Sequence, residues 1–288
     1  MRKELKFVKM HGLGNDYVYI DCFPTTAAAI IASTDLSALA RTVSDRHFGI
    51  GSDGLVMIMP SDKADFRMRM FNADGSEGNM CGNATRCIGK YVYDNHLTDK
   101  TEITLETRSG IKYLTLYPEN GKVQTVLVDM GKAILEPASI PMKAEGEEFI
   151  DRPVEVEGKT VNITAVSMGN PHAVTFVDDV ESLDLEKIGP SYENHPLFPE
   201  RVNTEFAKII DENTVMMRVW ERGSGETWAC GTGACACAVA CVKNGFFPYD
   251  REITVKLRGG DLFITYKSDG NVHMRGPAET VFTGEINI

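Results

Sequence analysis

The sequence predicts a mixed α/β protein of two similar domains, each with a sheet wrapped around one central helix. Short β-rich runs fill most of the chain, whereas helical patterns are few. Two of the helical patterns are apolar or small on nearly every face, which is typical of buried helices. A similar pentapeptide opens both of them, CGNAT at residues 81–85 and CGTGA at residues 230–234.

The strands are predicted from alternating or continuous apolar runs between turn residues. The run 66–71 is the clearest, with Phe66, Met68 and Met70 on one face and Arg67 and Arg69 on the other. In chain order the predicted strands are residues 5–9, 17–22, 55–59, 66–71, 102–107, 112–117, 123–130, 161–167, 173–177, 202–208, 214–220, 252–257, 262–266, 272–274 and 279–282.

Four segments are predicted to be helical. Residues 35–44 follow a possible cap at 33–35, and residues 183–188 form a short surface helix. The two buried helices run from about residue 81 to 93 and from about 230 to 242, where Asn244-Gly245 stops the second. Because the two similar pentapeptides stand about half the chain apart, a duplicated domain is expected, with a ligand cleft between the copies.

Composition excludes several classes of protein. The chain has 288 residues, with 30 basic and 41 acidic side chains and a net charge of −11. That balance argues against nucleic-acid binding and against an anionic membrane surface. No apolar run approaches a membrane span, and the start lacks the apolar core of a secretory signal. With seven cysteines, an odd and sparse number, the default expectation is the reducing cytoplasm.

The cysteines that open the buried helices, Cys81 and Cys230, are predicted to carry chemistry. The positive end of a helix is expected to lower the pKa of a thiol placed there. Amide groups at positions 82, 83, 231 and 232 would bind a carboxylate. A carboxylate held by both helix ends, with one thiol on each side of its α-carbon, is a racemase geometry that needs no metal or pyridoxal phosphate.

The remaining cysteines have a simpler interpretation as small buried hydrophobes. A metal site is the alternative for the last three, but their spacing is not typical of zinc and no histidine lies nearby in the sequence. The cysteines assigned to packing are Cys22, Cys87, Cys235, Cys237 and Cys241.

At these residues the chain resembles the diaminopimelate epimerases, a family of cofactor-independent enzymes with two catalytic cysteines. The resemblance runs nearly from end to end in ordered blocks. The blocks are KMHGLGND at 9–16, FNADGSE at 71–77, MCGNATRC at 80–87, SMGNPH at 167–172, PERVN at 199–203 and ERGSGETWACGTGA at 221–234.

The resemblance implies interconversion of LL- and meso-2,6-diaminopimelate, on the route to lysine and peptidoglycan precursors, with Cys81 and Cys230 as base and acid. His172 and Glu221 would help to set thiol ionisation. The implied substrate-binding residues are Asn15, Asn72, Gly82, Asn83, Asn170, Asn203, Glu221, Arg222, Gly231 and Thr232.

The family also implies two pseudo-symmetric domains, each a curled mixed sheet or barrel around a central helix, and suggests a homodimer. The expected domains are residues 1–129 with 275–288, carrying Cys81, and residues 130–274, carrying Cys230. No metal and no cofactor is expected. One departure stands at Gly54, where many members of the family have glutamine, so any contact made by that side chain would be lost.

Several alternatives remain open at this point. A proline racemase or hydroxyproline epimerase would typically have histidine at position 83 and lack the ERGxGE block, and a thiol-redox switch could use the same two cysteines. Asn15 could serve only a turn. His172 could be a loop histidine with satisfied hydrogen bonds, and Asn203 a surface residue of an edge strand. Arg86, one helical turn beyond Cys81, is interpreted as structural or as a residue that supports those in contact with substrate.

Overall fold

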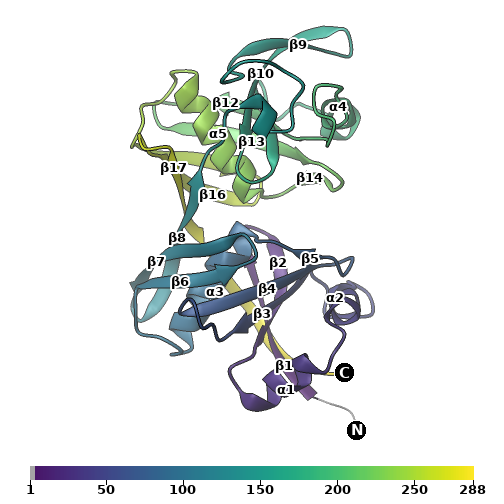
Figure 1. Ribbon diagram of the computed structural model, residues 1–288, viewed down its shortest axis with the longest axis vertical. Helices are drawn as coiled ribbons and strands as arrows, with labels where there is room; N and C mark the ends of the chain where they lie inside the picture. Colours follow the sequence, from purple (N-terminus) through teal and green to yellow (C-terminus); the bar gives the residue numbers. More distant parts are fainter. Residues whose placement is uncertain (1–3) are drawn as a thin grey trace. The chain divides into compact units, whose positions relative to one another are not determined.

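The computed structural model describes residues 4–288 and is a mixed α/β fold (Figure 1). It separates into two compact units. Unit 1 holds the residues up to Val128 together with Gly276–Ile288, and unit 2 holds Asp129–Arg275. Cys81 therefore belongs to unit 1 and Cys230 to unit 2. Within residues 4–288, no helix combines the length and apolar character that crossing a membrane requires.

Unit 1 is built of strands around the helix α3, with two further helices, α1 and α2, placed before β3. Its elements are β1 (Glu4–Gly12), β2 (Asn15–Asp21), α1 (Thr25–Ala32), α2 (Leu36–Ser44), β3 (Gly54–Met59), β4 (Phe66–Asn72), β5 (Glu77–Gly78), α3 (Gly82–Asp94), β6 (Glu102–Thr107), β7 (Gly110–Glu119), most of β8 (Lys122–Lys132) and β18 (Glu279–Asn287).

Unit 2 has the same kind of content around the helix α5. Its elements are the 3-10 turn η1 (Pro137–Ser139), β9 (Arg152–Val156), β10 (Lys159–Ser167), β11 (Pro171–Phe176), α4 (Leu185–Glu193), β12 (Asn203–Ile209), β13 (Thr214–Glu221), β14 (Gly225–Thr227), α5 (Gly231–Lys243), β15 (Glu252–Leu257), β16 (Gly260–Tyr266) and β17 (Asn271–Pro277).

The strand pairing repeats from one unit to the other. In unit 1, β1 pairs antiparallel with β2, β2 parallel with β3, β3 antiparallel with β4, and β4 parallel with β6. In unit 2, β10, β11, β12, β13 and β15 follow the same sequence of directions. The outer strands match as well, since β18 pairs antiparallel with β1 and β9 with β10. The predicted pseudo-symmetric α/β fold is confirmed.

The central helices are buried as their composition predicts. In α5 all residues from Gly231 to Val242 are buried except Thr232, and in α3 burial extends from Gly82 to Lys90. Small side chains allow the surrounding strands to pack closely. A Cβ atom on Gly89 would lie 2.8 Å from the Cδ2 atom of Leu116 on β7. A helix with no polar face is stable only inside such a shell.

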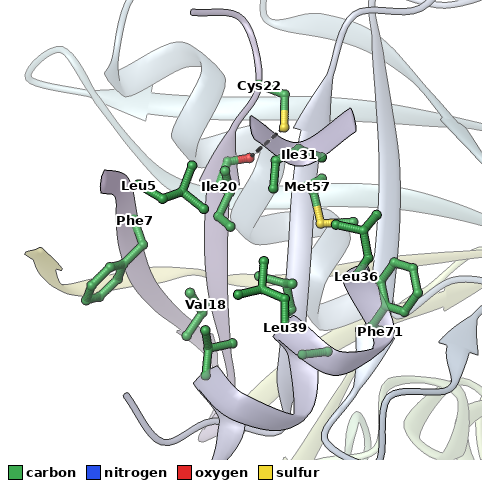
Figure 2. Close-up of a cluster of buried hydrophobic side chains, with 13 residues drawn as sticks. Leu5, Phe7, Val18, Ile20, Cys22, Ile31, Leu36, Leu39, Met57 and Phe71 are labelled. Carbon is green, nitrogen blue, oxygen red and sulfur yellow. Dashed lines mark hydrogen bonds between the residues drawn. The ribbon is translucent and has the colours of Figure 1, made fainter. Parts of the chain in front are cut away.

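A second layer of core in unit 1 lies between the sheet and the helices α1 and α2 (Figure 2). Phe7, Ile20 and Met57 from the strands pack with Ile31 and Leu36 from the helices. Cys22 lies in this cluster and directs its thiol to the carbonyl oxygen of Ile20, 3.8 Å away. The cluster covers the face of β1, β2 and β3 that packs against α1 and α2.

Some elements differ from the prediction. The helix α4 covers Leu185–Glu193 rather than 183–188, because Asp184 caps it and it continues past Pro190. The helix α1 and the short strands β5, β9 and β14 have no predicted counterpart. Pro153 suppresses the strand pattern in β9, although the strand pairs with β10.

Candidate active site

In unit 1 the candidate site is built on the N-terminus of α3. Cys81 is the N-cap residue, with φ −132° and ψ 123°, and Gly82 is the first residue of the helix. The first intrahelical bond closes from Thr85 N to Cys81 O at 2.9 Å. The amide groups of residues 82–84 therefore point out of the helix end, where an anion would find them.

Two asparagines line the Cys81 thiol. The Sγ atom lies 3.3 Å from Oδ1 of Asn15, which also accepts a 3.2 Å hydrogen bond from Nδ2 of Asn83. Asn15 begins β2, and Asn83 is the second residue of α3. Asn15, Cys81, Gly82 and Asn83 are thus brought together, and Asn15 does more than form a turn.

The hydrogen bond of the Asn72 side chain goes to a residue outside the group around Cys81. It is exposed at the end of β4 and donates a 3.0 Å hydrogen bond to Oγ of Ser76. Its backbone is in register with Gly54 on β3. A Cβ atom on Gly54 would lie 2.1 Å from the carbonyl oxygen of Phe71 and 2.9 Å from Cε1 of Tyr17. This backbone therefore leaves no room for a glutamine at position 54.

In unit 2 the same position is occupied by Cys230, the N-cap residue of α5. Its Sγ atom accepts a 3.3 Å hydrogen bond from the Gly233 amide and lies 3.5 Å from Oγ1 of Thr232. The first intrahelical bond closes from Ala234 N to Cys230 O. The Cys230 side chain is more buried than that of Cys81.

A chain of polar side chains leads away from Thr232. Its hydroxyl accepts from Nδ2 of Asn170 at 3.3 Å, and Oδ1 of Asn170 lies 3.1 Å from Nε2 of His172. Nδ1 of His172 lies 2.7 Å from Oε1 of Glu205, and both of these side chains are completely buried. Each ring nitrogen thus lies within hydrogen-bonding distance of an oxygen atom. His172 lies in β11, not in a loop.

Glu205 was not among the predicted site residues. It lies beneath the start of α5, since a Cβ atom on Gly233 would come within 2.6 Å of its Oε1 atom. Its Oε2 atom is buried with no hydrogen-bond partner. A signal existed in the sequence, because Glu205 is the one acidic residue inside the predicted strand 202–208.

The end of β13 carries the remaining predicted residues of unit 2. Glu221 is the last residue of the strand and accepts a hydrogen bond from Oγ1 of Thr227. Asn203 is buried between β11 and β13, so it is not a surface residue of an edge strand, and its Oδ1 atom accepts from the Arg222 amide at 2.9 Å. The Arg222 guanidinium donates to the carbonyl oxygen of Glu200 at 2.9 Å.

The prediction of lowered thiol pKa values is wrong. Burial raises the pKa of Cys81, and the amides of Ala84 and Asn83 offset the rise only in part. Burial also raises the pKa of Cys230 well above 9.0, and the charges of Glu221 and Glu205 raise it further. The helix ends act in the predicted direction, but desolvation outweighs them.

Glu221 shares this environment. Burial raises the pKa of its carboxyl group, while hydrogen bonds from Thr227 and Cys230 lower it. Within residues 4–288, no group of three or more His, Cys, Asp or Glu side chains is placed to hold a metal ion.

Comparison with known proteins shows the family. The family model described as "Diaminopimelate epimerase" matches residues 7–136 and 164–281. A diaminopimelate epimerase of Acetivibrio thermocellus is 56% identical over 285 residues, covering 99% of each chain. Relatives of the same name from Agathobacter rectalis and Methanococcus maripaludis are 57% and 54% identical, covering 99% of this chain and all of theirs.

Solved structures show the same fold at low identity. A hydroxyproline epimerase from Agrobacterium vitis with bound trans-4-hydroxy-L-proline has a TM-score of 0.70 and 13% identity, covering 100% of this chain and 94% of its own. A PhzF-family phenazine biosynthesis protein from Bacillus anthracis has a TM-score of 0.68 and 17% identity, covering 99% and 100%. By the family match and the full-length relatives, the chain belongs to the diaminopimelate epimerase family.

Proposed function

We propose that the chain converts LL-2,6-diaminopimelate to the meso isomer, in lysine and peptidoglycan-precursor biosynthesis, with Cys81 and Cys230 as its two proton-transfer groups. Membership of the family makes the chain an epimerase. The observation that carries the mechanism is that each pseudo-symmetric unit places a cysteine at the N-cap of its buried central helix.

In the proposed step, one cysteine thiolate removes the α-proton and the other thiol delivers a proton to the opposite face. The negative charge that develops on the α-carbon spreads onto the adjacent carboxylate. The amides of Gly82, Asn83, Gly231 and Thr232 would stabilise it there, as the donors of an oxyanion hole do. Only C–H and S–H bonds break and form in this step, and nothing is oxidised or reduced, so no further reactant is needed.

The raised thiol pKa values are compatible with the proposed proton transfer. Burial favours the protonated form of both thiols. A substrate ammonium group would bring positive charge next to the sulfur and favour the thiolate when it is needed. His172 and Glu221, which lie around Cys230, would then adjust its ionisation.

The other predicted residues would hold the substrate's polar ends. The Arg222 guanidinium can bind a carboxylate through two parallel hydrogen bonds, and Glu221 can pair with an ammonium group. The asparagines Asn15, Asn72, Asn170 and Asn203 supply neutral donors and acceptors. A second carboxylate would give Arg222 a partner that a proline substrate lacks, which favours diaminopimelate over the proline racemase alternative.

A cytoplasmic location and a homodimer belong to the same proposal. All seven cysteines, each within the described residues, are free thiols, which suits a reducing compartment. Light scattering after size exclusion should give about twice the mass of the 31.8 kDa chain. A mass equal to one chain would reject the dimer.

Proton exchange tests the activity directly. Incubation with LL-diaminopimelate in heavy water should place deuterium at one α-carbon, while L-proline should exchange no proton. Cys81→Ala and Cys230→Ala should each abolish epimerisation, whereas Cys237→Ala, a change inside α5 away from its N-cap, should retain it. Near-normal turnover in either single variant, or exchange with proline alone, would reject the proposal.

A further inference from the structure

The Asn15 side chain links the Cys81 thiol to a carboxylate. Its Nδ2 atom donates a 2.8 Å hydrogen bond to Oδ2 of Asp53, in the loop before β3. Its Oδ1 atom faces the Cys81 sulfur at 3.3 Å and accepts from Asn83. The amide is therefore shared between an acceptor on one side and the thiol on the other.

Charged groups at both ends determine which way the amides point. An ionised carboxylate only accepts, so Asp53 requires the NH2 group of Asn15. At the other end, Nη2 of Arg86 only donates, and it makes a 2.8 Å bond to Oδ1 of Asn83. Asn83 must then present its NH2 group to Asn15. Both constraints turn the Asn15 carbonyl oxygen toward Cys81.

Asp53 is itself held firmly. Its Oδ2 atom accepts from the Asp16 amide at 3.0 Å, and its Oδ1 atom accepts from Nη2 of Arg46 at 3.0 Å. Arg46 also pairs with the Asp16 carboxylate, which forms an ion pair with the buried Lys9. The Asp53 carboxylate is thus held by two groups besides Asn15, the Asp16 amide and the Arg46 guanidinium, which fix it in place independently of the Asn15 side chain.

We propose that Asp53 is a positioning residue, which holds the Asn15 carbonyl oxygen against Cys81 so that the thiol is kept protonated as a hydrogen-bond donor. A hydrogen bond to the neutral form of an acid favours that form. If Asn15 were free to rotate, its NH2 group could face the sulfur and favour the thiolate instead. The catalytic meaning of this device rests on the proposed role of Cys81.

Other groups also face Cys81 and act together with Asn15. Tyr17 and Tyr19 lie on β2, and Arg86 and Cys87 lie on α3. The Tyr17 hydroxyl and the Arg86 charge favour the thiolate, whereas burial opposes it. The Asp53 charge also acts on Tyr17, where it raises the pKa of the hydroxyl.

The test is the pH dependence of Cys81 alkylation by iodoacetamide in the full-length chain. Trypsin releases residues 70–86 as a peptide in which Cys81 is the only cysteine, so mass spectrometry follows this thiol alone. Asp53→Ala, which leaves Asn15 Nδ2 without its acceptor, should lower the alkylation midpoint and raise the rate at pH 7.5 by about threefold to tenfold, because more thiolate is present. An unchanged titration curve would overturn the proposal.

Two further variants separate positioning from direct charge. In an Asn15→Ala background, Asp53→Ala should shift the Cys81 midpoint much less than in the parent, because the amide that transmits the positioning is absent and only the charge effect remains. A shift as large as that in the parent would overturn the proposal. Arg46→Gln removes one contact of Asp53 but leaves the carboxylate and its bond from the Asp16 amide, so it should shift the Cys81 midpoint much less than Asp53→Ala does, and an equal shift would overturn the proposal.

The Asp53→Ser variant serves if Asp53→Ala does not fold, and the same downward shift is expected. Thiol titration does not depend on turnover, so its result stands apart from the proposed function. If Cys81→Ala retained epimerase activity while Asp53→Ala still shifted the titration, the positioning would hold and the catalytic role of Cys81 would fail.

Discussion

The indole Nε1 of Trp220 donates a 2.7 Å hydrogen bond to Oε2 of Glu193, and both side chains are buried. The other oxygen of Glu193 accepts from Arg201 and from the Gly223 amide, each at 2.9 Å. Glu193 ends α4, so it ties this helix to the turn that follows β13. That turn carries Arg222, the proposed partner of a substrate carboxylate.

Glu193→Gln should therefore weaken substrate binding more than it slows the chemical step. The amide replaces one acceptor oxygen with a donor that faces N–H groups, and an unsatisfied buried group of this kind costs about 1–3 kcal/mol. We expect KM to rise by about tenfold, with a smaller change in kcat and a lower free energy of unfolding. Steady-state kinetics and urea unfolding measure both effects.

Glu186→Gln provides the matched control, because Glu186 is an exposed residue of the same helix. It should leave KM and stability unchanged within error. If Glu193→Gln lowered kcat while KM stayed constant, the turn would not be positioned by Glu193 in the way that the hydrogen bonds indicate.

The sequence was sufficient for the fold where a pattern is repeated and strongly apolar. The buried helix 230–242 has no polar face, and the structure gives α5 as Gly231–Lys243. The matching pentapeptides predict a duplicated domain. The directions of strand pairing in unit 1 recur in unit 2. Local composition dictates these features, so no tertiary information is needed to find them.

Other elements depend on tertiary context. The helix α1 has no side-chain cap and no acidic residue in its first turn, and only Ile31 is buried. Proline hides the strand character of β9 and the length of α4. These segments take their form from packing against neighbouring elements, which a local pattern does not contain.

The residues of the candidate site also fall into those that local sequence predicts and those that depend on tertiary contacts. Residue types and spacing single out Cys81 and Cys230, because a helix end is a local feature. The roles of Glu205, Asp53 and Glu193 arise from contacts across 27 or more positions of sequence, and no local pattern encodes such contacts. The direction of the thiol pKa shifts could not be predicted from local sequence either, because burial is their main cause and burial depends on tertiary packing.

Gly233→Ala should impair catalysis through Glu205. The new Cβ atom would lie 2.6 Å from Oε1 of the completely buried Glu205 and 3.2 Å from the Cys230 sulfur. The carboxylate has no space to retreat without disturbing His172, its 2.7 Å partner. We expect kcat/KM to fall by at least about tenfold, together with an overpacking cost of about 1–3 kcal/mol.

Gly89→Ala in α3 separates the displacement of Glu205 from the general cost of overpacking a central helix. Its Cβ atom would meet the ends of flexible side chains, with Leu116 Cδ2 at 2.8 Å. It should lower stability while kcat/KM stays within about twofold of the parent. Equal losses of activity in both variants would show that overpacking of a central helix, rather than displacement of Glu205, is responsible.

Stability should fall as the pH rises above 9, because buried thiols keep their protons only in the folded state. Burial raises the pKa of Cys22 from 9.0 to about 12, and the pKa of Cys87 likewise to about 12. Between these values the unfolded chain releases protons that the folded chain retains, so higher pH favours unfolding. Each such thiol contributes about 1.4 kcal/mol per pH unit.

Urea unfolding at several pH values between 8 and 10.5, under reducing conditions, measures this slope. Cys22→Ala should be less stable than the parent at every pH, because it leaves a void in the cluster of Figure 2, but its stability should fall less steeply. Parallel slopes for the parent and the variant would show that Cys22 does not contribute to the pH dependence.

Glu221→Gln should make Cys230 easier to ionise. Burial is the main cause of the raised Cys230 pKa, and the charge of Glu221 is the next. The Glu221 carboxylate also accepts a hydrogen bond from the thiol, which favours its protonated form. Removing the charge should therefore shift the alkylation midpoint of Cys230 to lower pH, as followed by mass spectrometry with fragmentation to locate the label.

Glu226→Gln removes the same charge from the neighbouring strand β14, where Glu226 pairs with Arg218 rather than with Cys230. We expect no shift of the Cys230 midpoint in this variant. Equal downward shifts in the two variants would mean that Cys230 responds to the overall charge of unit 2. A shift confined to Glu221→Gln would mean that the carboxylate beside the thiol holds it in the protonated state.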